Sequence, residues 1–133
     1  MRVFYLDDDI DEVLLFSEAV HEIDPDIDFE GLTDSTEALR QLHLNPPPDV
    51  IFLDFNMPGL TGEDCLEYIQ QLPNYQNVPI VIYSTGVDDR LRQRLLRKGA
   101  AMVVNKHGTT ADFKIFFRNT FLSHSIKPFN RIR

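Results

Sequence analysis

The stretch VIFLDFNMPG, residues 50–59, decides the fold of this chain. It begins with apolar residues that suit a strand buried on both faces of a sheet, and it continues through proline and glycine into a loop. One carboxylate, Asp54, stands among the apolar residues. A buried carboxylate is costly unless it is paired or bound to a cation. The stretch therefore predicts a core strand that ends at a carboxylate, whose partners come from elsewhere in the chain.

The bulk composition predicts one soluble globular domain. The chain has 133 residues, of which 43% are hydrophobic and 26% are charged, as is common for a single domain. Its apolar runs are too short to span a bilayer, and its N-terminus lacks the basic-then-apolar pattern of a secretory signal. The single cysteine, Cys65, excludes an internal disulfide and a cysteine-rich metal site. We therefore expect a cytoplasmic protein with no membrane partner.

The net charge is −8, and it is divided unevenly along the chain. Residues 1–67 contain 18 acidic and 2 basic side chains, whereas residues 68–133 contain 3 acidic and 11 basic ones. Two interpretations fit this division. Either one fold interleaves two halves that attract each other, or an acidic face and a basic face bind separate partners. The overall acidity argues against general nucleic-acid binding.

Apolar runs alternate with helical patterns five times along the chain. The apolar runs predict strands over residues 2–6, 27–32, 49–55, 78–84 and 101–105. A helical pattern follows each run, and in the last helix the stripe Phe113, Phe116, Phe117 and Phe121 suits core packing or a partner surface. This alternation predicts an α/β fold with a parallel sheet and helices on both faces.

Capping residues mark several of the predicted helix ends. Asp9 precedes the first helix as an N-cap, and Asp34 precedes the second, with Glu37 three residues later as its capping-box partner. Gly62 belongs to the loop before the third helix, and Gly99 is placed to end the fourth. These signals support the helix boundaries independently of the apolar pattern.

Polar side chains with useful chemistry follow four of the predicted strands. Ligands of open parallel sheets bind beyond the carboxyl ends of the strands, where these side chains would meet. Clustered carboxylates repel each other without a cation, and hard oxygen donors suit Mg²⁺. A metal ion, an ammonium and a hydroxyl around one carboxylate suit a site that holds a phosphoryl group on it. The strand-end residues are Asp7, Asp8 and Asp9, then Asp54, then Ser84 and Thr85, and then Asn105 and Lys106.

Four short motifs in this order resemble a response-regulator receiver domain across nearly the whole chain. They are LDDD at residues 6–9, LDFNMPG at 53–59, YST at 83–85, and Lys106. The resemblance implies a flavodoxin-like fold, with five parallel strands in the order 2-1-3-4-5. It implies a receiver domain over residues 1–125 and a short basic C-terminal tail over residues 126–133, with no room for an output domain.

The resemblance also assigns roles to individual residues. Asp54 corresponds to the aspartate that a histidine kinase phosphorylates. The Ser84 hydroxyl would bond a phosphoryl oxygen, and Lys106 would pair with the phosphoryl group.

The Mg²⁺ ligands implied by the resemblance come from two segments. Asp8 would bind the metal directly, and Asp7 would act partly through water. Asp54 would be a further ligand, and Asn56 would offer its backbone carbonyl.

Two positions depart from the usual pattern of the family. His107 follows the lysine where proline is common, which argues against a cis peptide bond there. Val103 stands where a tyrosine or phenylalanine often acts as a moving switch. The output signal is therefore expected to leave the site by a route other than an aromatic rotamer.

The preferred function is a stand-alone response regulator in a phosphorelay, with output by partner binding or by passing the phosphoryl group on. Its partners would be a histidine kinase or phosphotransfer protein and an unknown downstream protein. One alternative is a Mg²⁺-dependent phosphohydrolase with Asp54 as nucleophile, but Asn56 stands where a general-acid aspartate is usual. Another alternative is an interaction module whose site has lost its chemistry.

The helix over residues 90–99 is strongly basic and has two interpretations. Four of its five cations, Arg90, Arg94, Arg97 and Lys98, form a solvated face or a partner surface. In the second case a homodimer through the last two helices and the fifth strand could pair these cations with Asp112 across a two-fold axis.

Overall fold

The computed structural model describes residues 1–106 and 108–122, in which five strands and five α-helices alternate along the chain. The strands are β1 (Arg2–Leu6), β2 (Asp28–Leu32), β3 (Val50–Leu53), β4 (Ile80–Ser84) and β5 (Met102–Asn105). The helices are α1 (Ile10–Ile23), α2 (Ser35–Leu44), α3 (Gly62–Gln70), α4 (Asp89–Arg97) and α5 (Thr110–Phe117), and a π-helical turn, η1 (Arg118–Leu122), follows α5. No helix in this described part has the length and apolar character needed to cross a membrane.

The five strands form one parallel sheet in the order β2-β1-β3-β4-β5, as predicted. In the register, Leu6 of β1 lies beside Leu32 of β2 and Leu53 of β3, and Ser84 of β4 lies beside Asn105 of β5. The carboxyl ends of these strands are therefore level with one another. The observed β3 is shorter than the predicted strand, so Asp54 is the first residue beyond it.

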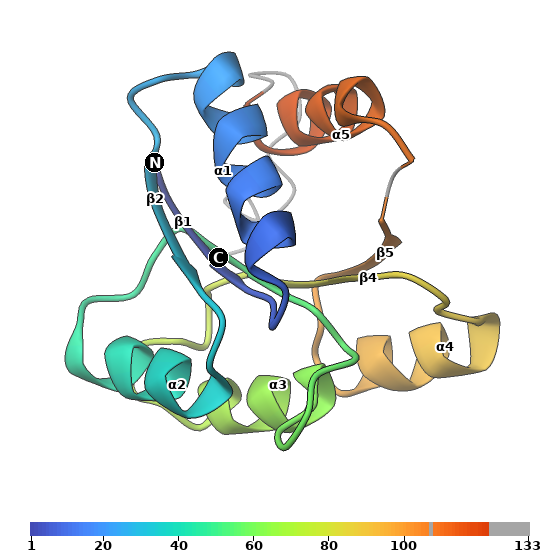
Figure 1. The fold of residues 1–133 in the computed structure, drawn as a ribbon. Coiled ribbons are helices and arrows are strands. Elements are labelled where there is room, and N and C mark those ends of the chain that lie inside the picture. The colour runs from blue at the N-terminus through green and yellow to red at the C-terminus, as the bar shows by residue number, and fades with distance from the viewer. Residues whose placement is uncertain (107, 123–133) are drawn as a thin grey trace.

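The helices cover both faces of the sheet, again as predicted (Figure 1). Helices α1 and α5 lie on one face, and α2, α3 and α4 lie on the other. Successive side chains of a strand point to opposite faces, so β3 contributes Val50 and Phe52 to the core under α1 and α5, and Ile51 and Leu53 to the other core. All four side chains are fully buried. The central strand is thus apolar on both faces, which explains the continuous apolar run in the sequence.

Polar caps fix the helix ends. The predicted N-caps are confirmed, because the side chain of Asp9 accepts a hydrogen bond from the backbone of α1 and that of Asp34 accepts one from α2. The prediction that Glu37 completes a capping box was wrong: its carboxylate accepts hydrogen bonds from Arg40 and Gln41, which are its neighbours along the helix.

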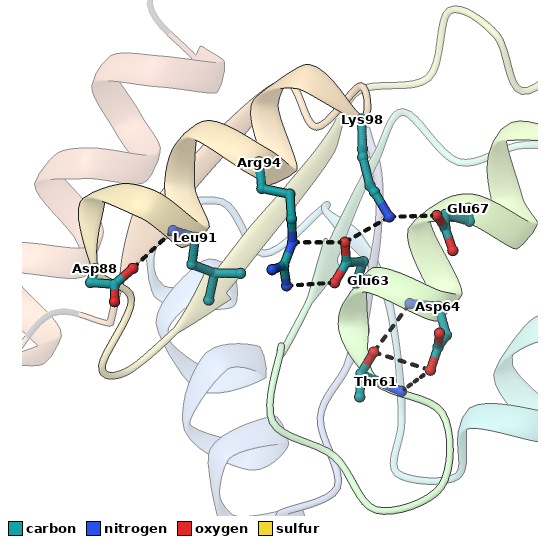
Figure 2. Close-up of polar contacts among 8 residues, drawn as sticks. All are labelled: Thr61, Glu63, Asp64, Glu67, Asp88, Leu91, Arg94 and Lys98. Atoms are coloured by element: carbon teal, nitrogen blue, oxygen red, sulfur yellow. Dashed lines mark hydrogen bonds and ion pairs between the residues drawn. The ribbon is translucent and has the colours of Figure 1, made fainter.

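The capping box occurs instead at the start of α3, between Thr61 and Asp64 (Figure 2). Gly62 is accordingly the first residue of that helix and does not belong to the loop. At the end of α4, Gly99 has φ +108°, a conformation that favours glycine, and it ends the helix as predicted.

The phenylalanine stripe near the C-terminus belongs to the core. Phe113 and Phe117 are the buried residues of α5, and Phe121, which lies in η1, packs against the same core. Cys65 is also buried. The predicted basic tail over residues 126–133 and the departure at His107 lie outside the described residues.

Candidate functional site

Backbone hydrogen bonds across the sheet bring the predicted site residues to one edge. The amide of Asp54 donates to the carbonyl of Leu6, the residue before Asp7. The amide of Lys106 likewise donates to the carbonyl of Ser84. Asp54 and Lys106 are therefore each placed by the strand next to their own. The predicted convergence of the strand ends is confirmed.

Asp54 is nearly enclosed, with 6% of its surface exposed. The Ser84 hydroxyl, which is also buried, donates a hydrogen bond of 2.8 Å to Asp54 Oδ1. Burial and then the negative charge of Asp7 raise the pKa of Asp54 above its usual range, although the bond from Ser84 and the charge of Lys106 act in the opposite direction. The hydrogen bond from Ser84 therefore fixes the Asp54 carboxylate, but the positive charge of Lys106 does not fully offset burial and the charge of Asp7.

Lys106 is the ammonium of the site. Its Nζ lies 2.7 Å from Asp7 Oδ2 and 3.6 Å from both Asp54 Oδ1 and Glu12 Oε1. Burial by itself would lower the pKa of Lys106, but the hydrogen bond to Asp7 and the charge of Asp54 outweigh burial and raise it. The lysine is therefore protonated at neutral pH, and it lies closer to Asp7 than to Asp54.

Two residues of the site were not predicted from the sequence. Glu12, on the first turns of α1, is the third carboxylate near Lys106. Tyr5 donates a hydrogen bond from its hydroxyl to Asp7 Oδ2. The period-two pattern of β1 could have found Tyr5, because residues 5 and 7 point to the same side of a strand.

Tyr5 stays protonated in this position. Burial and then the negative charge of Asp7 raise the pKa of its phenol far above the usual value. The hydroxyl is consequently a neutral donor throughout the physiological pH range.

Three carboxylates lie close enough to share a cation. One oxygen each from Asp7, Asp8 and Asp54 fall within 4.8 Å of one another, with Asp8 exposed and the other two buried. Asn56 is exposed two residues beyond Asp54, in the loop that leads to α3. Hard oxygen donors with excess negative charge fit Mg²⁺ well and fit softer metals poorly. The residues present therefore suit the cation that the sequence predicts.

Gly62 supports the site through its backbone. A Cβ built on Gly62 would lie 2.4 Å from the carbonyl oxygen of Asp54 and 2.8 Å from Cα of Phe55. The amide of Gly62 also donates to the carbonyl of Phe55. Only glycine allows this approach, so the start of α3 holds the backbone that bears Asp54.

The family model of the response regulator receiver domain matches residues 3–115, which is most of the chain. This chain belongs to the receiver domain family. The resemblance predicted from the sequence motifs is thus confirmed. Receiver domains are signalling proteins of two-component systems.

Several curated relatives resemble this receiver. A probable chemotaxis protein CheY from Rhizobium etli is 25% identical over 123 residues, which span 91% of this chain and 92% of that protein. The two-component response regulator ARR3 of Arabidopsis thaliana is 32% identical over 102 residues, spanning 76% of this chain and 42% of the relative. The match to hybrid signal transduction histidine kinase D of Dictyostelium discoideum, at 34% identity, covers 4% of that protein. The receiver thus spans less than half the length of several relatives.

Solved structures share the fold of this receiver. The phosphorylated cyanobacterial phytochrome response regulator RcpA superposes with a TM-score of 0.81 at 21% identity, covering 96% of this chain and 97% of that one. The Mn²⁺-bound response regulator Rcp1 gives 0.78 at 19% identity, covering 95% and 96%. At these identities the likeness establishes the flavodoxin-like fold alone.

A buried valine, Val103, occupies the position where an aromatic switch residue is usual. Val103 on β5 is buried in the core beneath α2, α3 and α4. Its backbone carbonyl accepts a hydrogen bond from the guanidinium of Arg92 on α4. The neighbouring Asn105 side chain accepts from the amide of Val87, in the loop before α4. Two polar contacts, from Arg92 and from the amide of Val87, therefore connect α4 and the loop before it to β5.

Ion pairs also connect α4 to α3 (Figure 2). Arg94 forms two hydrogen bonds with the carboxylate of Glu63, and Lys98 lies 2.8 Å from Glu63 and 2.7 Å from Glu67. These pairs join the acidic and basic halves of the chain, as the first interpretation of the charge division predicts. Two of the four cations proposed for a homodimer, Arg94 and Lys98, thus have partners within the chain, although all four are exposed.

Proposed function

We propose that this receiver accepts a phosphoryl group on Asp54 from the phosphohistidine of a histidine kinase or a phosphotransfer protein. An Asp54 carboxylate oxygen attacks phosphorus, the P–N bond to imidazole breaks, and its electron pair remains on the departing nitrogen. The product is an acyl phosphate on Asp54. The single observation that supports this role is the enclosure of one carboxylate by the Ser84 hydroxyl, the Lys106 ammonium and the Asp7–Asp8 pair.

The side chains around Asp54 have separate tasks in this proposal. The Ser84 hydroxyl, which now donates to Asp54 Oδ1, donates to a phosphoryl oxygen after transfer. Lys106 pairs with another phosphoryl oxygen, and both interactions strengthen as charge moves onto the transferring group.

Asp8, Asp54 and the Asn56 carbonyl would hold Mg²⁺, with Asp7 beside them. When bound, Mg²⁺ supplies positive charge that offsets the carboxylates and the phosphoryl oxygens. The excess of carboxylates over ammonium groups around Asp54 supports this assignment.

The output is a change in protein binding or onward transfer of the phosphoryl group, in a cytoplasmic phosphorelay. The acyl phosphate would bias two arrangements of α4 and β5. Arg90 and Arg97, which form no ion pair with the described part of the chain, would bind a downstream partner or a second copy of the receiver. Neither a nucleic acid nor a membrane is a proposed partner.

The test is a mass measurement on the intact protein. Incubation with acetyl phosphate and Mg²⁺ is expected to add one phosphoryl group, which hydroxylamine removes. Asp54→Asn is expected to prevent the addition, and Asp26→Asn, the same change at an exposed aspartate in the turn after α1, is expected to retain it. Absence of an adduct on the wild-type protein would contradict the proposal, and so would catalytic turnover of many phosphoesters.

A further inference from the structure

Tyr5 is a fully buried residue whose hydroxyl forms a hydrogen bond with Asp7 of the phosphorylation site. It lies two residues before Asp7 on β1 and points to the same side of the strand. Its ring stacks on Phe16 of α1, with the centroids 4.3 Å apart. Its hydroxyl donates to Asp7 Oδ2 at 2.5 Å. The ring is thus held by the core, and the hydroxyl is directed at one oxygen of the site.

The Asp7 carboxylate accepts hydrogen bonds from three donors. Oδ2 accepts from the Tyr5 hydroxyl and from the Lys106 ammonium, which lies 2.7 Å away. Oδ1 accepts from the amide of Asp9 at 3.0 Å. Because Asp7 is 1% exposed, bulk water does not replace a donor that is lost. The direction of this carboxylate therefore depends on the donors that remain on Oδ2.

Lys106 is the donor that has to move. It lies 3.6 Å from Asp54 Oδ1 and 2.7 Å from Asp7. Pairing with a phosphoryl group on Asp54 takes the ammonium away from Asp7 Oδ2. Without another donor, that oxygen would be left buried and unpaired, at a free-energy cost that slows the transfer.

We propose that Tyr5 is a positioning residue, whose hydroxyl holds Asp7 in place while Lys106 moves from Asp7 to the phosphoryl group. This inference rests on the proposed phosphoryl transfer to Asp54. It assigns to Tyr5 no contact with the phosphoryl group itself, because its effect passes through Asp7. The hydroxyl is the functional part, and the ring serves the core.

Tyr5→Phe isolates the hydroxyl, since it keeps the ring and its stacking. The matched control is Tyr75→Phe: Tyr75 is also buried, and its hydroxyl donates to the carbonyl of Leu42, away from the site. With acetyl phosphate and saturating Mg²⁺, Tyr5→Phe is expected to form the Asp54 adduct about tenfold more slowly, the rate equivalent of one hydrogen bond to a charged group. Tyr75→Phe is expected to stay within about twofold of wild type, although it also loses a buried phenol hydrogen bond, here to a neutral carbonyl.

A double-mutant cycle separates positioning from a merely structural role. In a Lys106→Ala background no ammonium leaves Asp7, so adding Tyr5→Phe is expected to slow the reaction no further. Equal rates for Tyr5→Phe and Tyr75→Phe would overturn the inference, and so would a tenfold effect of Tyr5→Phe that persists without Lys106. If wild type itself forms no adduct, the proposed function fails, and the inference fails with it.

A measurement on the wild-type protein keeps the inference testable if Tyr5→Phe does not fold. The hydroxyl proton of selectively labelled Tyr5 can be followed by NMR before and after phosphorylation. When Lys106 leaves, Tyr5 becomes the remaining donor of the pair on Asp7 Oδ2, and its proton resonance is expected to move downfield. An unchanged resonance would overturn the inference.

Discussion

The two faces of the sheet are filled by different kinds of side chain. Under α1 and α5 the core is rich in aromatic side chains, and Tyr5, Phe52 and Tyr83 from three strands surround Phe16. Under α2, α3 and α4 the core is mainly aliphatic. Aromatic pairs have preferred mutual geometries as well as large buried areas. The aromatic face therefore fixes the directions of its side chains more tightly than the aliphatic face does.

The two faces also reach the site by different means. The aromatic face reaches it through a side chain, because the Tyr5 hydroxyl bonds to Asp7. The aliphatic face reaches it through backbone, because Gly62 at the start of α3 contacts the carbonyl of Asp54. Core packing is therefore coupled to site geometry at two separate contacts, the Tyr5–Asp7 hydrogen bond and the approach of Gly62 to Asp54. Substitutions can disrupt each contact separately.

Removing the ring of Phe16, which the other rings of the aromatic face contact, is expected to have the largest effect. Phe16→Ala should cost about 4 kcal/mol in free energy of unfolding. It should also weaken Mg²⁺ binding severalfold, because the Tyr5 ring loses its stacking partner and Asp7 loses a fixed donor. The control, Leu42→Ala in α2, should cost about 3 kcal/mol without changing Mg²⁺ affinity. Urea unfolding and calorimetric Mg²⁺ titration measure the two quantities. Equal weakening of Mg²⁺ binding by Leu42→Ala would contradict the comparison.

Closing the backbone contact of the aliphatic face is expected to have the next largest effect. Gly62→Ala should cost roughly 2 kcal/mol, since the new methyl group meets backbone atoms that cannot move aside. It should also slow adduct formation on Asp54. Gly108→Ala, where the methyl group has free space, is the control and should leave both the unfolding midpoint and the adduct rate nearly unchanged. A Gly62→Ala protein that takes up phosphoryl groups at the wild-type rate would show that α3 does not hold Asp54.

Removing the charge of Asp54, where the two faces meet, is expected to stabilise the fold. Asp54→Asn should add about 1 kcal/mol at pH 7 without Mg²⁺, because burial and Asp7 oppose ionisation while the amide oxygen can still accept from Ser84. A raised folded pKa means that wild type loses stability as pH rises from about 3.9, the ordinary pKa of aspartate. The advantage of Asp54→Asn should therefore vanish below about pH 4.

Thermal unfolding of both proteins across this pH range checks the sign. Mg²⁺ should raise the wild-type midpoint more than that of Asp54→Asn. An Asp54→Asn protein less stable than wild type at pH 7 would mean that Lys106 and Ser84 outweigh burial.

The sequence predicted the fold well because its signals were local and mutually consistent. Apolar runs predicted the five strands, and side chains such as Asp54, Ser84 and Lys106 stood directly at their ends. The strand order was then enough to predict that these side chains lie close together. Glu37 was assigned wrongly because a capping box and an intrahelical ion pair with Arg40 use the same residue spacing.

The unpredicted parts of the site depend on tertiary distances. Tyr5 looked like one more apolar residue of a strand. The period-two spacing places it on the same side as Asp7, but the hydrogen bond between them depends on how the core orients the Tyr5 ring. Gly62 looked like a loop glycine, because the approach of Asp54 is visible only in three dimensions. The pairing of Arg94 and Lys98 with α3 likewise depends on how two helices pack.

The smallest predicted effect concerns how the outer helices are held. Helix α4 is connected to α3 by Glu63, which faces both Arg94 and Lys98, whereas α1 and α5 share a single pair, Glu22 with Lys114, in the part of the chain that the structure describes. Glu63→Gln should cost roughly 0.5 kcal/mol at low salt and nearly nothing in 1 M NaCl. Glu22→Gln should lower the free energy of unfolding by less at either salt concentration, because the rings of Phe16 and Phe113 already pack α1 against α5.

The pH dependence gives this last prediction a definite sign. The hydrogen bond from Lys98, followed by that from Arg94, lowers the pKa of Glu63. The stability that Glu63 contributes is therefore complete above about pH 4.3, the ordinary pKa of glutamate, and is lost as pH falls toward the lowered value. Thermal midpoints of wild type and Glu63→Gln should accordingly converge in acid. If they stay apart at low pH or in high salt, the Glu63 side chain stabilises α4 by packing, and the two faces hold their helices by the same means.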